Sequence, residues 1–182
     1  IDMAFMGHLE AQGDGFGAFV DVMYIDLGDN KDFDRFYTNS ELSAIVLDAA
    51  GVWSPGEGRY SGFDVIAGLR YIDLDFQANL VPNDPLFDRV SVDNNKSYSD
   101  FLIGARYVGD FNPKWGYALR ADGSFGQTDG TYNLQALLTY KFTHGVLSGG
   151  YRYFDVSLPI GNNGGDLDMT LNGVVIGYTF VF

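Results

Sequence analysis

The chain contains no cysteine, and its 11 basic residues are outnumbered by 24 acidic ones, which gives a formal net charge of −13 over 182 residues. The absence of cysteine excludes a disulfide scaffold and thiol chemistry. The negative charge argues against nucleic acid as a partner, because its phosphates would be repelled. It also argues against the basic surface that binds anionic lipid headgroups.

Long apolar runs are also missing. No segment approaches the roughly 20 uninterrupted apolar residues of a membrane helix, although 46% of the residues are hydrophobic and the mean hydropathy is −0.04. The apolar residues are therefore interleaved with polar ones. Aromatic residues make up 16% of the chain and there are 24 glycines, as in β-barrels with aromatic girdles and tight bends. We expect residues 1–182 to form a single domain.

The last twelve residues, 171–182, place five apolar side chains on one face of a strand: Val174, Ile176, Tyr178, Phe180 and Phe182. A strand with this many rings on one face suits a surface that contacts lipid. The stretch resembles the C-terminal strand of bacterial outer-membrane β-barrels, which typically ends in Phe. The resemblance implies the outer membrane of a Gram-negative bacterium as the location and the barrel-insertion machinery as a partner.

Period-two alternation of apolar and polar residues predicts nine strands, most of the length that a tilted membrane strand requires. They cover residues 3–12, 15–27, 42–53, 60–76, 98–109, 115–126, 131–142, 145–158 and 169–182. Helical spacing is not sustained anywhere. The sequence therefore predicts an all-β, transmembrane, antiparallel up-and-down barrel.

The predicted connections alternate between short turns and long loops, the loops covering residues 28–41, 77–97 and 159–168. Outer-membrane barrels have short periplasmic turns and longer extracellular loops, and an even number of strands. The first and last predicted strands run in the same direction, so one strand before Ile1 is missing from an even-numbered barrel. We expect ten strands in full length, with nine in this chain; the alternative is eight, with one of the nine misassigned.

Aromatic residues beside the short turns predict a periplasmic girdle, which comprises Phe16, Trp53, Tyr60, Trp115, Phe142 and Phe182. A soluble β-sandwich or lipocalin-like barrel with an aromatic core is the alternative for the fold.

A Gly-x-Arg-Tyr core recurs at Gly68, Gly104 and Gly150, and because adjacent residues of a strand face opposite sides, its Arg is predicted to face inward and its Tyr outward. The segment Gly-Tyr-Arg-Tyr-Phe-Asp at 150–155, the terminal strand and Met-Ala-Phe-Met-Gly-His-Leu-Glu at 3–10 together resemble a widespread group of uncharacterised bacterial outer-membrane proteins, small OmpA-like and OmpW-like barrels with a C-terminal Phe. The resemblance implies an additional upstream strand and no established chemistry.

If the apolar face contacts lipid, the opposite face lines the lumen. The predicted lumen charge network comprises His8, Glu10, Asp21, Asp48, Asp64, Arg70, Asp100, Arg106, Arg120, Asp122, Lys141 and Arg152, and Asn133, Gln135, Thr139 and Asn172 are also expected to face inward. Mixed signs favour carboxylate–guanidinium pairs that hold the interior shut. The first functional hypothesis is therefore a structural or interaction protein of the outer membrane. The alternative is a narrow, porin-like diffusion channel.

A lumen-rim hydrolase is the second alternative, in which Glu10 orients His8 as a general base. The two histidines, His8 and His144, are far apart and cysteine is absent, so we expect no transition-metal site. Because no catalytic constellation is recognisable, we also expect no cofactor and no catalytic residues. The predicted loops are acidic, so they could share divalent cations with lipopolysaccharide. Because unpaired strand edges are not tolerated in lipid, another chain or segment is expected to close the seam between the first and last strands.

Overall fold

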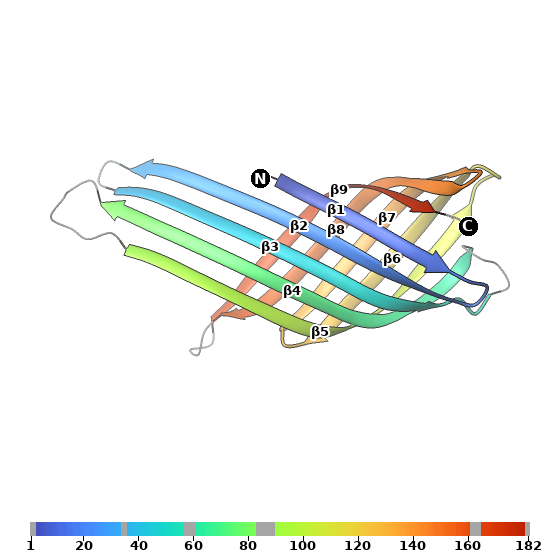
Figure 1. Cartoon of the computed structure of the whole chain (residues 1–182), viewed down its shortest axis with the longest axis horizontal. Coiled ribbons are helices and arrows are strands. Elements are labelled where there is room, and N and C mark those ends of the chain that lie inside the picture. Colours follow the sequence, from blue (N-terminus) through green and yellow to red (C-terminus); the bar gives the residue numbers. More distant parts are fainter. Residues whose placement is uncertain (1–2, 34–35, 57–60, 83–89, 161–164, 181–182) are drawn as a thin grey trace.

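The computed structural model describes residues 3–33, 36–56, 61–82, 90–160 and 165–180. In these residues nine strands form one antiparallel sheet in which each strand pairs with the next (Figure 1). The strands are β1 (Met3–Gln12), β2 (Phe16–Phe33), β3 (Phe36–Trp53), β4 (Gly62–Pro82), β5 (Val90–Asp110), β6 (Trp115–Gly126), β7 (Gly130–Phe142), β8 (Gly145–Ile160) and β9 (Gly165–Phe180). The predicted all-β up-and-down architecture is confirmed. Each of the nine predicted stretches forms a strand, so none is misassigned as the eight-strand alternative required.

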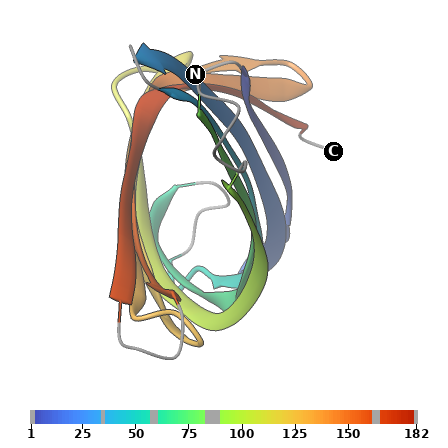
Figure 2. The same cartoon turned by 90° about the vertical axis from the view of Figure 1, so that its left-hand side faces the viewer.

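The sheet curls into a flattened, nearly closed barrel (Figure 2). Its first and last strands approach each other, with Cα atoms of β1 and β9 within 8 Å, but no ladder of pairs joins these two strands in the described residues. Because every pair from β1 to β9 is antiparallel, β1 and β9 run in the same direction. We call the opening between them the seam. Within the described residues, no helix is long and apolar enough to cross a membrane.

The two ends of the barrel differ in how far the strands extend. At one end, which we call the turn end, the connections are residues 13–15, 54–61, 111–114 and 143–144. At the other, the loop end, β2 to β5 project well beyond β6 and β7 (Figure 1). β1 pairs with β2 only as far as Asp26, and β6 pairs with β5 only from Asp100. The projecting part is therefore a four-stranded sheet whose outer strands, β2 and β5, pair there with no further strand among the described residues.

The predicted long loops are wrong in their extent. Most of residues 28–41, 77–97 and 159–168 continue the strands, and only residues 34–35, 83–89 and 161–164 lie outside the described residues. Asp and Asn residues have low strand propensity, but those of these stretches that the structure describes are each paired in register with a neighbouring strand. The register also continues without interruption past Asp26 and Asp75.

In the half of the barrel near the turn end, apolar residues face outward, and the buried charged residues face inward beside a few apolar ones such as Ile66. On β4, Leu69 and Tyr71 are exposed, whereas Asp64 and Arg70 are buried. On β8, Tyr151 and Tyr153 are exposed and Arg152 is buried.

Toward the loop end this polarity reverses on the same strands. Beyond Tyr71, the outward side of β4 continues with Asp73, Asp75 and Gln77, and beyond Arg70 the inward side continues with Ile72 and Leu74. β8 changes at the corresponding level, from Tyr153 to Asp155 outside and from Arg152 to Phe154 inside. The inside and outside therefore exchange character at one level of the barrel.

The glycines of the Gly-x-Arg-Tyr repeat lie where neighbouring strands leave no room for a side chain. A Cβ atom at Gly68 would meet the backbone of Ala49 and Ala50, and one at Gly150 would meet the backbone of Ala136 and Leu137. At Gly104 it would meet Asp122 and the carbonyl of Ala121. In each repeat the arginine two residues later faces inward and the following tyrosine faces outward, as the repeat predicts.

Candidate functional site

The interior of the turn-end half contains one continuous chain of ion pairs. It runs through Asp64, Arg106, Glu10, His8, Asp21, Arg120, Asp122, Arg70 and Asp48, and so joins six strands, β1 to β6. Asn133 on β7 extends it by donating to Asp122 at 2.6 Å, and Arg152 on β8 donates to Asn133 at 2.6 Å. We call these eleven residues the lumen network.

The register explains why the network crosses the barrel instead of following the sheet. Asp21 and Asp48 are direct neighbours on β2 and β3, and Arg106 and Arg120 are neighbours on β5 and β6. Like charges that face each other on adjacent strands repel. The charges of each like-charged pair are neutralised by residues of the opposite wall. Arg120 Nη1, for example, donates to Asp21 Oδ2 at 2.6 Å.

Arg70 is the centre of the network, and its side chain is completely buried. Its Nε and Nη2 atoms donate to the two oxygens of Asp48, both at 2.7 Å, and Nη2 also donates to Asp122 at 2.7 Å. Nη1 donates to the hydroxyl of Thr131 at 2.5 Å, and the guanidinium stacks 5.0 Å from the ring centroid of Phe154. All the polar atoms of this arginine are therefore occupied.

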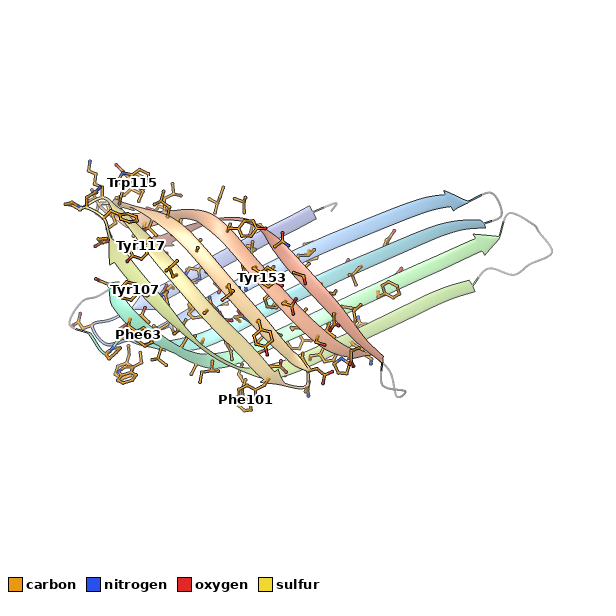
Figure 3. The ribbon with its side chains drawn as sticks, turned by 180° about the vertical axis from the view of Figure 1, so that it is seen from behind. Phe63, Phe101, Tyr107, Trp115, Tyr117 and Tyr153 are labelled. Atoms are coloured by element: carbon orange, nitrogen blue, oxygen red, sulfur yellow. The ribbon has the colours of Figure 1, made fainter. Side chains whose placement is uncertain are left out.

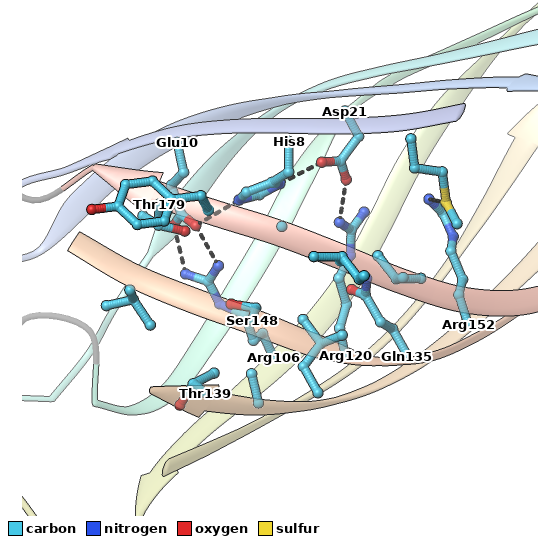
Figure 4. A pocket seen from close by; sticks show the side chains of 18 of the residues that line it. His8, Glu10, Asp21, Arg106, Arg120, Gln135, Thr139, Ser148, Arg152 and Thr179 are labelled. Carbon is cyan, nitrogen blue, oxygen red and sulfur yellow. Dashed lines mark hydrogen bonds and ion pairs between the residues drawn. The ribbon is translucent and has the colours of Figure 1, made fainter. Parts of the chain in front are cut away.

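A second branch of the network connects β1 to β4 and β5. Arg106 donates both terminal nitrogens to the carboxylate of Glu10 at 2.7 Å, and its Nε donates to Asp64 at 2.8 Å. The His8 ring lies between two carboxylates, with Nε2 3.1 Å from Glu10 and Nδ1 bonded to Asp21 (Figure 4). Both ring nitrogens of His8 are thus engaged.

Two residues of the predicted network have other surroundings. Asp100 is buried, but its carboxylate accepts hydrogen bonds from the Ser124 and Thr128 hydroxyls and from the backbone N–H groups of Gln127 and Thr128. It therefore caps the connection between β6 and β7. Lys141 pairs at 2.6 Å with Asp110 near the turn end, and both side chains are about one-third exposed.

The prediction that Asn172 faces inward is wrong. Asn172 lies on the exposed side of β9 with Val174 and accepts a hydrogen bond of 2.8 Å from Tyr151. Asn133 and Thr139 are buried, and Gln135 is partly buried. Side chains alternate along a strand, so Asn172 and Val174, which are two residues apart, lie on the same face. The outward position of Asn172 could therefore have been predicted from that of Val174.

Apolar side chains fill the interior on the loop side of the network, where sequence reasoning expected a polar lumen. This cluster, which we call the apolar plug, consists of Met23, Ile25, Ala44, Val46, Ile72, Leu74, Tyr98, Phe154, Val156 and Leu158. Strands from opposite walls contribute to it, and Tyr98 of β5 donates a 3.0 Å hydrogen bond to the carbonyl of Pro159 on β8. A smaller cluster of Phe19, Ala50, Val52, Ile66 and Leu102 fills part of the turn end.

Exposed apolar side chains cover the outside of the turn-end half. Of the predicted girdle, Phe16, Trp53, Trp115 and Phe142 are at least 42% exposed, and Tyr60 and Phe182 lie outside the described residues. Figure 3 shows further outward rings, Phe63, Tyr107, Tyr117 and Tyr153, on the same surface. We call the exposed apolar surface that these aromatic residues and the apolar side chains between them form the outer belt.

A cavity of about 120 Å³ remains inside the barrel, between the lumen network and the turn end. Inward side chains of β1, β2 and β5 to β9 line it, among them Arg106, Gln135, Thr139, Ser148 and Thr179 (Figure 4). Among the described residues, no group of three or more His, Cys, Asp or Glu side chains could hold a metal ion.

Comparisons of the chain with protein-family models, with curated proteins and with solved structures give no match. Function must therefore be inferred from the arrangement of the residues themselves.

Proposed function

We propose that the protein is an integral outer-membrane β-barrel of a Gram-negative bacterium, in which the turn-end half spans the bilayer and the loop-end half projects into water. The reversal of polarity carries this proposal. In a barrel that spans lipid, the outer surface is apolar and the lumen is polar. In a soluble β-structure, the outer surface is polar and the core is apolar. Both arrangements occur along β4 and along β8, with the change between Tyr71 and Asp73 and between Tyr153 and Asp155.

The length of the outer belt supports the same conclusion. On β6 the outward residues run from Trp115 to Phe125, and on β7 from Tyr132 to Phe142, which is about 11 residues on each strand. A tilted membrane strand needs roughly 9–11 residues, and aromatic rings are enriched at both interfaces. All four of these terminal residues are exposed rings.

The interior supports a sealed barrel over a diffusion channel. Arg70, Asp48 and Asp122 are at most 7% exposed, and Phe154 of the apolar plug stacks on the guanidinium of Arg70. A solute would have to break a buried ion-pair network and then cross an apolar layer. We propose that the barrel is a membrane anchor with a structural or interaction role, and that the projecting sheet of β2 to β5 is its interaction surface.

The channel remains the second candidate, because the cavity beside the network is the one observation that favours it. A hydrolase has less support. Both ring nitrogens of His8 are engaged by carboxylates, and Glu10 is already bound by two nitrogens of Arg106. A general base needs a ring nitrogen that faces its substrate.

Three partners fit this proposal. Lipid contacts the outer belt, the barrel-insertion machinery recognises the C-terminal strand, and one further strand closes the seam. Because β1 and β9 run in parallel, a single strand that is antiparallel to both could pair with each of them. The projecting sheet carries Asp26, Asp73 and Asp75 beside the belt, where divalent cations could link carboxylates to lipopolysaccharide phosphates.

The proposal is tested by folding the chain into phospholipid vesicles, separating the vesicles by flotation and measuring single-channel conductance in a planar bilayer. We expect the folded chain to float with the vesicles and to give no steady conductance. Arg106→Ala serves as a comparison, because it opens the network at its less buried branch, where the Arg106 side chain is 11% exposed. A chain that stays in the aqueous fraction contradicts the membrane proposal, and steady wild-type conductance favours the channel.

A further inference from the structure

Four basic residues line the cavity near the turn end: Arg106, Arg120, Arg152 and Lys141. Three of them are paired with carboxylates at 2.8 Å or less, Arg106 with Glu10 and Asp64, Arg120 with Asp21 and Asp122, and Lys141 with Asp110. Arg152 is the exception. Low-dielectric walls strengthen the field of an incompletely paired charge beside such a cavity.

Arg152 is the basic residue of this set whose charge is least compensated. The residue is 5% exposed, and its Nε donates to the neutral amide of Asn133. Nη1 lies 3.8 Å from the sulfur of Met6, and Nη2 has no hydrogen-bond partner. The nearest carboxylate oxygen, on Asp48, is 3.9 Å from Nη2.

Arg120 competes for the same carboxylate. Its Nη2 atom also lacks a hydrogen-bond partner and lies 3.5 Å from the same oxygen of Asp48. Arg70 already occupies both oxygens of Asp48. Two buried guanidiniums therefore present unused donors around one saturated carboxylate, and a buried donor without an acceptor is unfavourable.

We propose that the cavity binds one compact monovalent anion, a short carboxylate or a halide, beside Arg152 and Arg120. A guanidinium matches the geometry of a carboxylate, and a small rotation of Arg152 would turn its free Nη2 from Asp48 toward the cavity. One water needs roughly 10–15 Å³ of such a volume, so about 120 Å³ accommodates acetate or chloride together with water. The lining includes Gly7 and Ile176 on the two sides of the seam, which gives a small ion a route inward.

The test is acetate binding to the chain folded in detergent, measured by the NMR linewidth of carbon-13 acetate. Ionic strength is kept constant with gluconate, which is too large for the cavity. We expect saturable binding that chloride displaces, and at least a tenfold loss of affinity in Arg152→Gln. Arg152→Lys, which keeps the charge, should retain more affinity than Arg152→Gln, and Lys114→Gln in the exposed 111–114 turn should match the wild type.

Circular dichroism establishes that each variant is folded. If Arg152→Gln does not fold, Ser148→Leu provides the same test by filling the cavity without removing a charge, and we expect it to abolish binding. The proposal is overturned if acetate and chloride show no saturable binding to the wild type. It is also overturned if a folded Arg152→Gln or Ser148→Leu variant binds acetate as the wild type does. This test is independent of the membrane proposal, because it needs only the folded barrel.

Discussion

Arg70 donates two hydrogen bonds of 2.7 Å to the two carboxylate oxygens of Asp48, and the two side chains retain 0% and 1% of their exposed surface. These residues are direct neighbours on β3 and β4, but Arg70 also reaches Asp122 on β6 and Thr131 on β7. One side chain thus links strands of opposite walls. We therefore expect the geometry of the barrel at this level to depend on Arg70.

Replacing Arg70 with methionine should destabilise the barrel severely, because Asp48 and Asp122 would each lose a buried cation. Breaking a buried ion pair by removing one partner costs about 3–5 kcal/mol. Urea unfolding in detergent or vesicles, followed by tryptophan fluorescence, measures the change. Lys141→Met on β7 is the matched control, because its pair with Asp110 is exposed and should contribute less than about 1 kcal/mol. Equal effects of the two substitutions would refute a structural role for the network.

The repeat glycines should not tolerate alanine. At Gly150 a Cβ would lie 2.8 Å from the Cα of Leu137, and backbone atoms cannot rotate away as the end of a side chain can. We expect Gly150→Ala to cost at least as much as the roughly 1–3 kcal/mol of overpacking, or to prevent folding. Gly177→Ala, on β9, meets nothing within 4 Å and should fold like the wild type. The refolding yield and the unfolding midpoint measure both effects, and a fully stable Gly150→Ala would show that the strands can separate without cost.

Asp100 should contribute to stability and not to permeation. Its carboxylate accepts from Gln127 N–H at 2.7 Å and from the Ser124 hydroxyl at 2.8 Å, and Asp100→Asn replaces one of its two acceptor oxygens with an NH2 donor. We expect a loss of about 1–3 kcal/mol in urea unfolding and no conductance. Asp155→Asn, on the outer side of β8, is the control and should have a small effect. A conducting Asp100→Asn barrel would mean that the residue forms part of a constriction.

The nine strands and the inward position of the buried charges could be predicted from the sequence, because alternation of period two fixes both. Arg70 and Tyr71, or Arg152 and Tyr153, are adjacent and must face opposite sides. The partners of these charges could not be predicted in the same way. The bond between Arg106 and Glu10 joins residues 96 positions apart, and it depends on the curvature of the whole sheet.

The apolar plug was missed for a related reason. One apolar face was assigned to lipid along the full length of each strand, so Ile72 and Leu74 were not recognised as interior residues. The signal was present on β4, where Asp73 and Asp75 alternate with them on the outward side. Under the membrane proposal, the exchange of polarity after Tyr71 marks the level at which the outer surface leaves the lipid.

Removing the outer part of the β2–β3 hairpin, which supplies two of the four strands of the projecting sheet, should leave the barrel folded. Gly28 pairs with Glu41, so a short turn joining these residues would replace the outer part of the β2–β3 hairpin. The members of the apolar plug on these strands, Met23, Ile25, Ala44 and Val46, all lie on the barrel side of this cut. We expect the shortened chain to fold and to float with vesicles. Failure to insert would show that the projecting strands contribute to barrel formation and are not only an interaction surface.

The depth of tryptophan in a bilayer tests the central claim most directly, because Trp53 and Trp115 are exposed rings at the turn end. Single-tryptophan variants, made with Trp53→Phe and Trp115→Phe, are folded into vesicles of lipids brominated either near the headgroup or near the end of the acyl chain. We predict that both native tryptophans are quenched best by bromine near the headgroup. A tryptophan at Leu138, in the middle of the belt on β7, should be quenched best by bromine near the chain end, and one at Asp75 by neither. If the tryptophan at Leu138 is no more quenched than the one at Asp75, the outer belt does not contact lipid and the membrane proposal is wrong.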